Sequence, residues 1–148
     1  MKRNYQKDFP KKILIDTGVI LDFFFDRKPH SDNSTIILNL CERRQLEGFI
    51  TPVIISNTYY LLRRTAKHEK IIEKLKQLLT ITHVLQMDRQ VIEKALNSEF
   101  KHFENALQNF SAINYGKIEV IITRNVKDYK KSEIGVLTPE NFVKLINA

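Results

Sequence analysis

Residues 13–18 read ILIDTG, three apolar residues followed by an aspartate and a polar turn. Residues 120–128 read VIITRNVKD and repeat this pattern near the other end of the chain, with a second apolar run that ends in polar residues. In an open α/β sheet, ligands gather beyond the carboxyl ends of the parallel strands. We therefore expect Asp16 and Asp128 to lie close together at one edge of a sheet, where a divalent cation can hold both carboxylates.

Length and composition favour one globular domain. The chain has 148 residues, of which 43% are hydrophobic, and a domain of this size buries roughly 70% of the surface that its unfolded chain exposes. No apolar run approaches the ~20 residues that cross a bilayer, and the first residues lack the hydrophobic stretch of a signal peptide. These features predict a cytoplasmic protein with no membrane partner. The one cysteine, Cys41, cannot form an internal disulfide, and we interpret it as a packed residue in a reducing compartment.

The chain is basic, with 24 Lys and Arg residues against 17 Asp and Glu residues and a formal net charge of +7. Such a field attracts a polyanion such as RNA. The same basic runs are equally consistent with solvated faces, so charge alone does not decide between these interpretations. Residues 1–11 form a candidate basic arm ahead of a single domain at residues 12–148. For the arm, simple disorder, an artificial leader and an RNA-contacting segment remain open.

Strand-like and helix-like segments alternate along the chain. Alternation of this kind predicts an α/β fold with a mainly parallel central sheet covered on both faces. In the helix expected over residues 100–114, spacing places Phe100, Phe103, Leu107 and Phe110 on one face, which we expect to be core. Strands are expected at residues 12–16, 49–51, 80–85, 119–123 and 134–137, and helices at residues 19–25, 31–47, 52–62, 67–79, 88–96, 100–114 and 139–146.

Four segments together resemble a PIN domain. They are residues 16–22 (DTGVILD), 55–60 (ISNTYY), 102–108 (HFENALQ) and 123–129 (TRNVKDY), and the resemblance extends over nearly all of residues 13–146. The resemblance implies a three-layer α/β/α sandwich. It also implies a metal-dependent ribonuclease that hydrolyses phosphodiester bonds, since PIN domains are typically enzymes of this kind. Many members of the family are toxins of bacterial toxin-antitoxin pairs.

The resemblance also implies a site. By position it assigns Asp16 to the first metal-binding carboxylate and Asp128 to the carboxylate region that follows the fourth strand. With Glu104, these residues form the candidate catalytic and metal-binding set, and Thr123 and Asn125 are the polar neighbours that line the pocket. Asp and Glu oxygens suit Mg²⁺ or Mn²⁺, which can activate water and stabilise the charge on a scissile phosphate.

This chain departs from the family pattern at several positions. Asn57 and Asn105 occupy places that are usually acidic, His102 stands where Asp is common, and Gly18 stands where Asn is usual. An asparagine offers a neutral carbonyl oxygen to a metal but adds no negative charge and cannot act as a general base. We therefore expect a weakened acidic site. Asn57 and Asn105 line either an inactive metal site or a site that binds RNA without metal.

Each acidic residue also has a purely structural interpretation. Asp16 can cap the helix that follows it, and Asp22 can be a solvated or locally hydrogen-bonded residue inside that helix. Glu104 lies in a first helical turn, where the dipole alone favours an acid. Asp128 can be a salt-bridge partner in a basic stretch, and His102 can be simply exposed rather than a metal ligand.

Three functions follow from these observations. The first is a toxin-type, metal-dependent endoribonuclease that forms a homodimer and is inhibited by an antitoxin-like protein. The second is a catalytically inactive protein of the same fold that binds RNA or a protein partner. The third, a response-regulator-like phosphate-transfer domain, is disfavoured because the chain has no glycine-rich phosphate loop and no suitable lysine after a late strand.

Overall fold

The computed structural model describes residues 9–147, and most of the candidate arm, residues 1–8, lies outside this range. A central sheet with five parallel strands organises the described part of the chain, in the order β3-β2-β1-β4-β5. The strands are β1 (Lys12–Ile15), β2 (Glu47–Ile50), β3 (Thr82–Val84), β4 (Val120–Ile122) and β5 (Gly135–Leu137). The order runs outward in one direction from β1 to β3 and in the other from β4 to β5. The topological switch point therefore lies between β1 and β4, where ligands bind in open α/β sheets.

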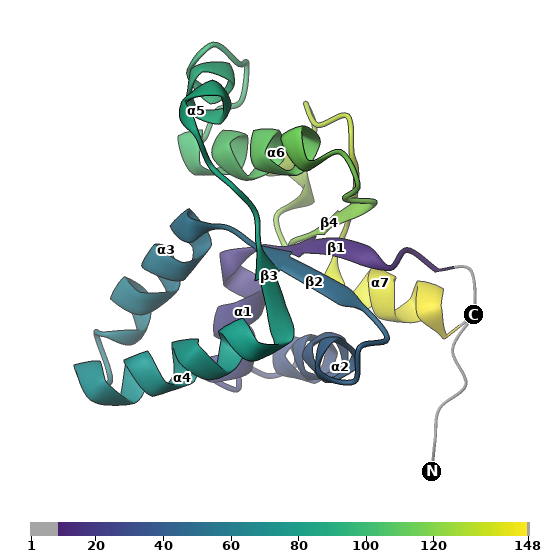
Figure 1. Cartoon of the computed structure of the whole chain (residues 1–148). Helices are drawn as coiled ribbons and strands as arrows, with labels where there is room; N and C mark the ends of the chain where they lie inside the picture. The colour runs from purple at the N-terminus through teal and green to yellow at the C-terminus, as the bar shows by residue number, and fades with distance from the viewer. Residues whose placement is uncertain (1–8, 148) are drawn as a thin grey trace.

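Helices cover both faces of this sheet, so the expected three-layer α/β/α architecture is confirmed. Figure 1 shows α1, α2 and α7 below the sheet and α5 and α6 above it, while α3 and α4 extend to one side. The helices are α1 (Thr17–Phe24), α2 (His30–Glu42), α3 (Pro52–Leu62), α4 (His68–Ile81), α5 (Arg89–Leu96), α6 (Phe103–Tyr115) and α7 (Pro139–Ile146). A short 3₁₀ turn, η1 (Val126–Tyr129), follows β4.

Short polar residues start several helices. The side chains of Asp16, Thr51, Asp88 and Thr138 accept hydrogen bonds from backbone N–H groups in the first turns of α1, α3, α5 and α7. Such caps satisfy donors that have no partner within a helix. At the other end of α6, Gly116 adopts a left-handed conformation with φ of 83°, which glycine tolerates without steric cost. These local signals fix where the chain turns toward and away from the sheet.

The core lies between the sheet and its helices. The β1 residues Ile13, Leu14 and Ile15 are fully buried, and Phe9 packs into the same cluster. Cys41 is also buried, as the interpretation of a packed residue requires. Its sulfur lies against Gly48, where a Cβ atom would come within 2.7 Å of Sγ. The close contact between α2 and β2 therefore depends on a residue without a side chain.

The sequence-based boundaries are wrong in three places. The helix expected to end near residue 47 stops at Glu42, because β2 begins at Glu47. The β-branched run at residues 80–85 yields only the short strand Thr82–Val84, since α4 continues through Ile81. The helix expected from residue 100 begins at Phe103, whose side chain is 47% exposed rather than core. At these boundaries of α2, α4 and α6, tertiary packing outweighs local propensity.

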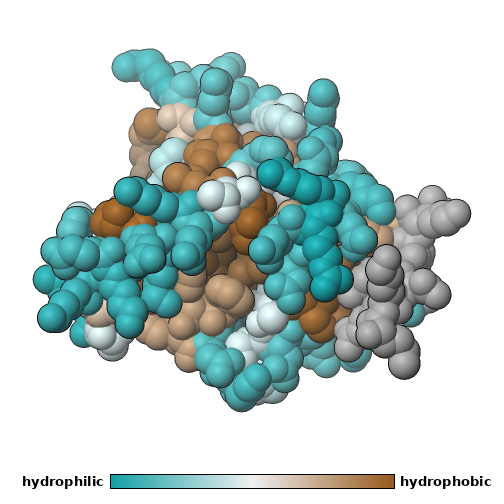
Figure 2. All heavy atoms as spheres, turned by 60° about the horizontal axis from the view of Figure 1, so that its bottom comes forward, coloured by the Kyte–Doolittle hydropathy of each residue, from teal (hydrophilic) through white to brown (hydrophobic). Residues whose placement is uncertain are grey.

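One face of the molecule has an apolar hollow framed by hydrophilic side chains (Figure 2). A cavity of about 270 Å³ lies between α1, α2 and α4, where Phe23, Phe24 and Leu78 contribute apolar walls and Lys74 lies at the edge. Among the described residues, no helix is both long enough and apolar enough to span a membrane.

Candidate functional site

The site begins at the carboxyl ends of β1 and β4. The Thr123 hydroxyl donates a 2.8 Å hydrogen bond to Asp16 Oδ2, and the Thr17 amide donates to Asp16 Oδ1 at 2.9 Å. The Asn125 amide in turn donates to the Thr123 hydroxyl oxygen at 3.1 Å. Both oxygens of Asp16 are thus oriented by neighbours from two strands. Asp16 also caps α1, so its structural and site interpretations are not exclusive.

Burial and nearby charges both act on Asp16. Loss of water around its carboxylate is the largest cause of a raised pKa, and the negative charges of Glu104 and Asp128 raise it further. The hydrogen bonds from Thr123 and Thr17 act in the opposite direction because they stabilise the ionised form. The structure therefore places the three predicted carboxylates in one electrostatic neighbourhood, although Glu104 and Asp128 lie 88 and 112 positions after Asp16 in the sequence.

Glu104 and Asp128 each have a neighbour that the sequence analysis singled out. The Asn57 side-chain amide on α3 donates a 3.0 Å hydrogen bond to Glu104 Oε2 on α6. His102 Nε2, just before α6, lies 3.8 Å from Asp128 Oδ1 on η1. The side chain of His102 is 62% exposed, and that of Asp128 is 35% exposed. The Asp128 carboxylate is therefore partly open to solvent beside His102.

Two buried hydroxyl groups near the carboxylates have no hydrogen-bond partner. Tyr129 Oη and Thr17 Oγ1 are both enclosed and unpaired among the described residues. Tyr129 is 1% exposed, and its pKa is raised by burial and by the charges of Asp16, Asp128 and Glu104. An unpaired buried hydroxyl costs free energy. Tyr129 was missed by the sequence analysis, although it immediately follows Asp128 in the quoted motif.

The remaining pocket residues are less tightly held. Asn105, one position after Glu104, is partly exposed and its side chain makes no hydrogen bond within residues 9–147. The Asn125 side chain is exposed beside the Asp16 loop. In the same range, no three His, Cys, Asp or Glu side chains are grouped closely enough to form a ready-made metal site.

Asp22 is not solvated, contrary to one sequence-based alternative. Its carboxylate is completely buried, with Arg124 Nε 2.8 Å from Oδ2 and Arg124 Nη2 donating to Oδ1 at 3.1 Å. Arg27 NH1 lies 3.8 Å from Oδ1. Arg124 follows Thr123 directly, so this ion pair fixes α1 against the loop after β4. Sequence patterns gave no signal for the pair because 102 residues separate its partners.

The donor set suits a hard divalent cation. The carboxylates of Glu104 and Asp128 act on Asp16, and all three act on Tyr129, whose buried hydroxyl group is unpaired. Thr17, next to Asp16 in the sequence, carries a second unpaired hydroxyl group. Mg²⁺ keeps several of its water molecules and is bound through one or two protein carboxylates, so it does not need a closed cage of three. The orphaned hydroxyls can hydrogen-bond to such water molecules. The residues present therefore fit a hydrated Mg²⁺ or Mn²⁺ ion.

These features define a class: a parallel α/β protein with an acidic pocket at the switch point of its sheet. Residues 12–127 match the family model of the PIN domain. The chain therefore belongs to the PIN domain family.

Similar proteins agree with this assignment. Ribonuclease VapC1 of Aquifex aeolicus is 25% identical over 142 residues, which cover 93% of this chain and 96% of the relative. A toxin-antitoxin complex from Klebsiella pneumoniae contains a chain with a TM-score of 0.64 and 21% identity, covering 86% of this chain and 97% of that one. VapBC2 from Rickettsia felis, solved with a DNA fragment from its promoter, gives a TM-score of 0.64 at 15% identity, with 85% and 97% coverage. These two solved structures share the fold.

Proposed function

We propose that this protein is a toxin-type endoribonuclease that depends on Mg²⁺ or Mn²⁺ and has a weakened acidic site. The observation that carries the proposal is the convergence of Asp16, Glu104 and Asp128 on one pocket at the switch point of the sheet. The net charge of +7 favours a polyanionic substrate such as RNA. Support also comes from the similarity to Ribonuclease VapC1 over nearly the whole chain.

Asp16, Glu104 and Asp128 would hold the ion. When bound, a divalent ion lowers the pKa of a water molecule and stabilises negative charge on a phosphate. Thr123 and Thr17 orient the two oxygens of Asp16, and this orientation limits the rearrangement needed on binding. Tyr129 Oη offers a hydrogen-bond donor at the buried side of the pocket. Burial is the main cause of the raised pKa of Asp16, and repulsion from Glu104 and Asp128 adds to it; a cation that binds there relieves this repulsion.

The asparagines explain why the site is weak. Asn57 satisfies Glu104 with a neutral amide, and Asn105 contributes no charge. With fewer anions around the pocket, the attraction for a divalent cation is smaller. The oxygen of each amide remains a possible neutral ligand. We therefore infer lower metal affinity than an all-acidic pocket of the same shape would have.

RNA cleavage with and without divalent cations tests the proposal. The Asp16→Asn variant keeps a capping oxygen but removes the charge, so cleavage should fall by about 100-fold or more, because a metal contributes several kcal/mol to such reactions. Asp88→Asn is the matched control, since Asp88 caps α5 in the same way and should leave cleavage unchanged. Cleavage that survives both chelation and Asp16→Asn would point to a contaminating enzyme and would refute the proposal.

A second candidate function is binding without catalysis. The neutral Asn57 and Asn105 side chains favour it, because they add no negative charge beside Glu104. In this alternative the basic protein binds RNA or a protein partner and cleaves nothing. Salt-sensitive RNA binding with no cleavage under any metal condition would support it.

Partners are proposed by similarity. Solved structures with the same fold come from complexes described as toxin-antitoxin assemblies. We propose an antitoxin-like protein partner, a homodimer as the functional unit, and action in the cytoplasm. Light scattering over a wide concentration range tests the homodimer, and a single monomeric species throughout would count against it.

A further inference from the structure

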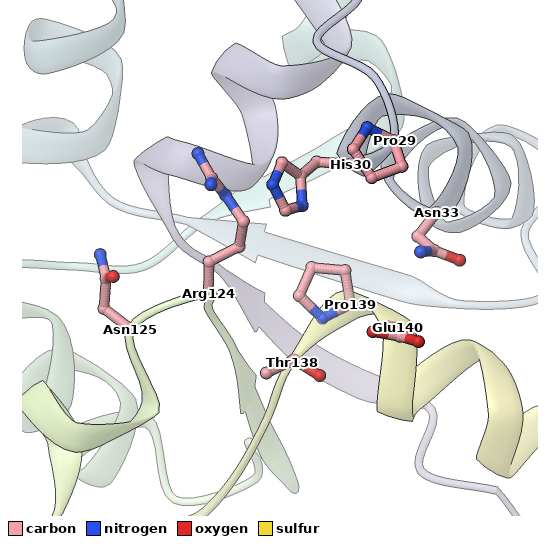
Figure 3. A pocket seen from close by; sticks show the side chains of 8 residues that line it. All are labelled: Pro29, His30, Asn33, Arg124, Asn125, Thr138, Pro139 and Glu140. Atoms are coloured by element: carbon pink, nitrogen blue, oxygen red, sulfur yellow. The ribbon is translucent and has the colours of Figure 1, made fainter.

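A cavity borders the loop after β4, the same loop whose Thr123 contacts Asp16. Its volume is about 370 Å³. Figure 3 shows that its side chains come from three segments that are distant in sequence. These are the start of α2 (Pro29, His30, Asn33), the loop after β4 (Arg124, Asn125) and the start of α7 (Thr138, Pro139, Glu140). We call this cavity the Arg124 pocket.

Arg124 brings a guanidinium group to the wall of the Arg124 pocket. Arg124 shares the single buried carboxylate of Asp22 with Arg27, which does not line the cavity, so these three side chains together carry one net positive charge. The one acidic residue that lines the cavity, Glu140, is paired with Lys144 at 3.3 Å. Outside the cavity, Asp26 before α2 and Asp32 in the first turn of α2 both pair with Lys28, and these three side chains together carry one net negative charge.

Hydrogen-bond donors around the Arg124 pocket are free. The side chains of His30, Asn33 and Asn125 make no hydrogen bond within residues 9–147. Two helices, α2 and α7, begin at the wall of the cavity, and Pro29 provides no side-chain cap to α2. The positive ends of both helix dipoles therefore add to the charge of the arginines. Together these groups form a concave site for an anion.

The position of the Arg124 pocket relative to Asp16 identifies the anion. Thr123 holds Asp16, and the next residue, Arg124, lines the cavity. Asn125 borders both places. A nucleic-acid strand that presents one phosphate to the acidic pocket must overcome repulsion from three carboxylates. A cavity lined by the Arg124 guanidinium group, one residue after Thr123, offsets that repulsion by holding a neighbouring phosphate.

We propose that the Arg124 pocket binds a backbone phosphate of the RNA strand beside the phosphate at the acidic pocket. This inference rests on the proposed function, in which RNA is the ligand. It assigns Arg124, His30 and Asn33 to substrate positioning. None of them belongs to the predicted metal-binding set.

Charge-changing variants at Asn33 test the proposal. Arg124 itself is unsuitable because it also neutralises Asp22. Asn33→Asp adds a negative charge at the cavity, and Asn39→Asp makes the same change on the same helix outside it. Binding of a short single-stranded RNA is measured by fluorescence anisotropy in chelator, so that metal-dependent cleavage is absent. Asn33→Asp should weaken binding about 3- to 10-fold relative to Asn39→Asp, as expected for one charge at close range in water.

The opposite change sharpens the test. Asn33→Lys should tighten RNA binding by a similar factor, whereas Asn39→Lys should have a smaller effect. Equal effects at positions 33 and 39 would overturn the proposal, as would a native protein that does not bind the RNA at all. Inorganic phosphate is tested separately by NMR. If phosphate shifts the signals of His30 and Asn33 but RNA does not, the pocket serves a free anion and the proposed role is wrong.

Cleavage assays on the same variants separate this proposal from the proposed function. If the native protein cleaves RNA while position 33 has no special effect on binding, the nuclease remains and the phosphate subsite is refuted. If no protein cleaves RNA but the Asn33 and Asn39 variants differ as expected, the subsite remains and the inactive, RNA-binding alternative is favoured.

Discussion

The Thr123 hydroxyl donates a 2.8 Å hydrogen bond to Asp16 Oδ2, joining two residues that are 107 positions apart in the sequence. Each residue follows the last position of a neighbouring parallel strand, β1 or β4. This bond orients one carboxylate at the switch point of the sheet, and the charges of Glu104 and Asp128 act on the same carboxylate. The fold thus assembles an acidic pocket from segments near both ends of the chain.

The raised pKa of Asp16 predicts a specific dependence of stability on pH. The folded protein holds the Asp16 proton more tightly than the unfolded chain, in which the pKa is about 3.9. Asp16 therefore stabilises the fold most at low pH, and this contribution is lost as pH rises through the interval between the two pKa values. The stability of the native protein minus that of Asp16→Asn should fall across this interval and then level off.

Urea unfolding of both proteins at several pH values measures this difference. Subtraction removes the contributions of other groups, such as Glu47, whose pKa is lowered by its ion pair with Lys12. A difference that increases with pH would show that the hydrogen bonds to Asp16 outweigh burial and repulsion.

Tyr129→Phe should not destabilise the protein. The substitution removes a buried hydroxyl that has no partner and leaves the ring in place. Because an unsatisfied buried hydroxyl costs about 1–3 kcal/mol, the free energy of unfolding without metal should stay the same or rise by about 1 kcal/mol. Thermal or urea unfolding checks this. A loss larger than about 1 kcal/mol would mean that the hydroxyl makes a stabilising hydrogen bond in the folded protein.

The Asp22–Arg124 pair should respond unequally to the loss of each partner. Arg124→Met leaves Asp22 fully buried with only Arg27 nearby, at 3.8 Å, and removing one partner of a buried pair costs about 3–5 kcal/mol. Asp22→Asn leaves an arginine whose side chain is 34% exposed and can be hydrated, so the cost should stay below about 2 kcal/mol. Equilibrium unfolding of both variants gives the order, and a larger loss in Asp22→Asn would contradict this account.

Cys41 should be inert in the folded protein. Its side chain is 1% exposed, and burial raises the pKa of its thiol to about 12. Since the thiolate is the reactive form, iodoacetamide should modify Cys41 only as fast as the protein unfolds. Mass spectrometry of samples with and without urea measures the two rates. Rapid modification without urea would indicate that α2 separates readily from β2.

The apolar runs at residues 13–15 and 120–122 carried enough information to predict the central strands and the sheet edge at which Asp16 lies. Both runs are fully buried in the sheet, and buried parallel strands are recognisable as continuous apolar segments. Capping residues were equally informative, because Asp88 and Thr138 act within a few residues of their own position. Local patterns therefore predict elements whose determinants are local.

Contacts between distant segments were not predictable in the same way. Helical spacing predicted that Phe103 belongs to the core, but Phe103 lies in the first turn of α6, where its side chain is 47% exposed. The sequence around Asp22 did not indicate its pairing with Arg124, and Tyr129 was part of a quoted motif without a role of its own. Each of these depends on which segments meet in three dimensions. The sequence could nominate Glu104, but its hydrogen bond from Asn57 required the packing of α3 near α6.

Calorimetric titration with Mn²⁺ tests the central claim most directly, namely that the acidic pocket binds a divalent cation and is weakened by its asparagines. The native protein is compared with the Asn57→Asp, Asn105→Asp double variant, and Asp16→Asn serves as the control that removes a proposed ligand. In the double variant, the new carboxylate at position 57 should repel Glu104 in the absence of metal. The cation should therefore also stabilise the double variant more than the native protein.

We expect Mn²⁺ to bind the native protein weakly and not to bind Asp16→Asn measurably. It should bind the double variant at least about 10-fold more tightly than the native protein, a difference of about 1.4 kcal/mol in binding free energy. Absence of binding in both the native protein and the double variant, or equal binding in all three, would contradict a metal site built on Asp16.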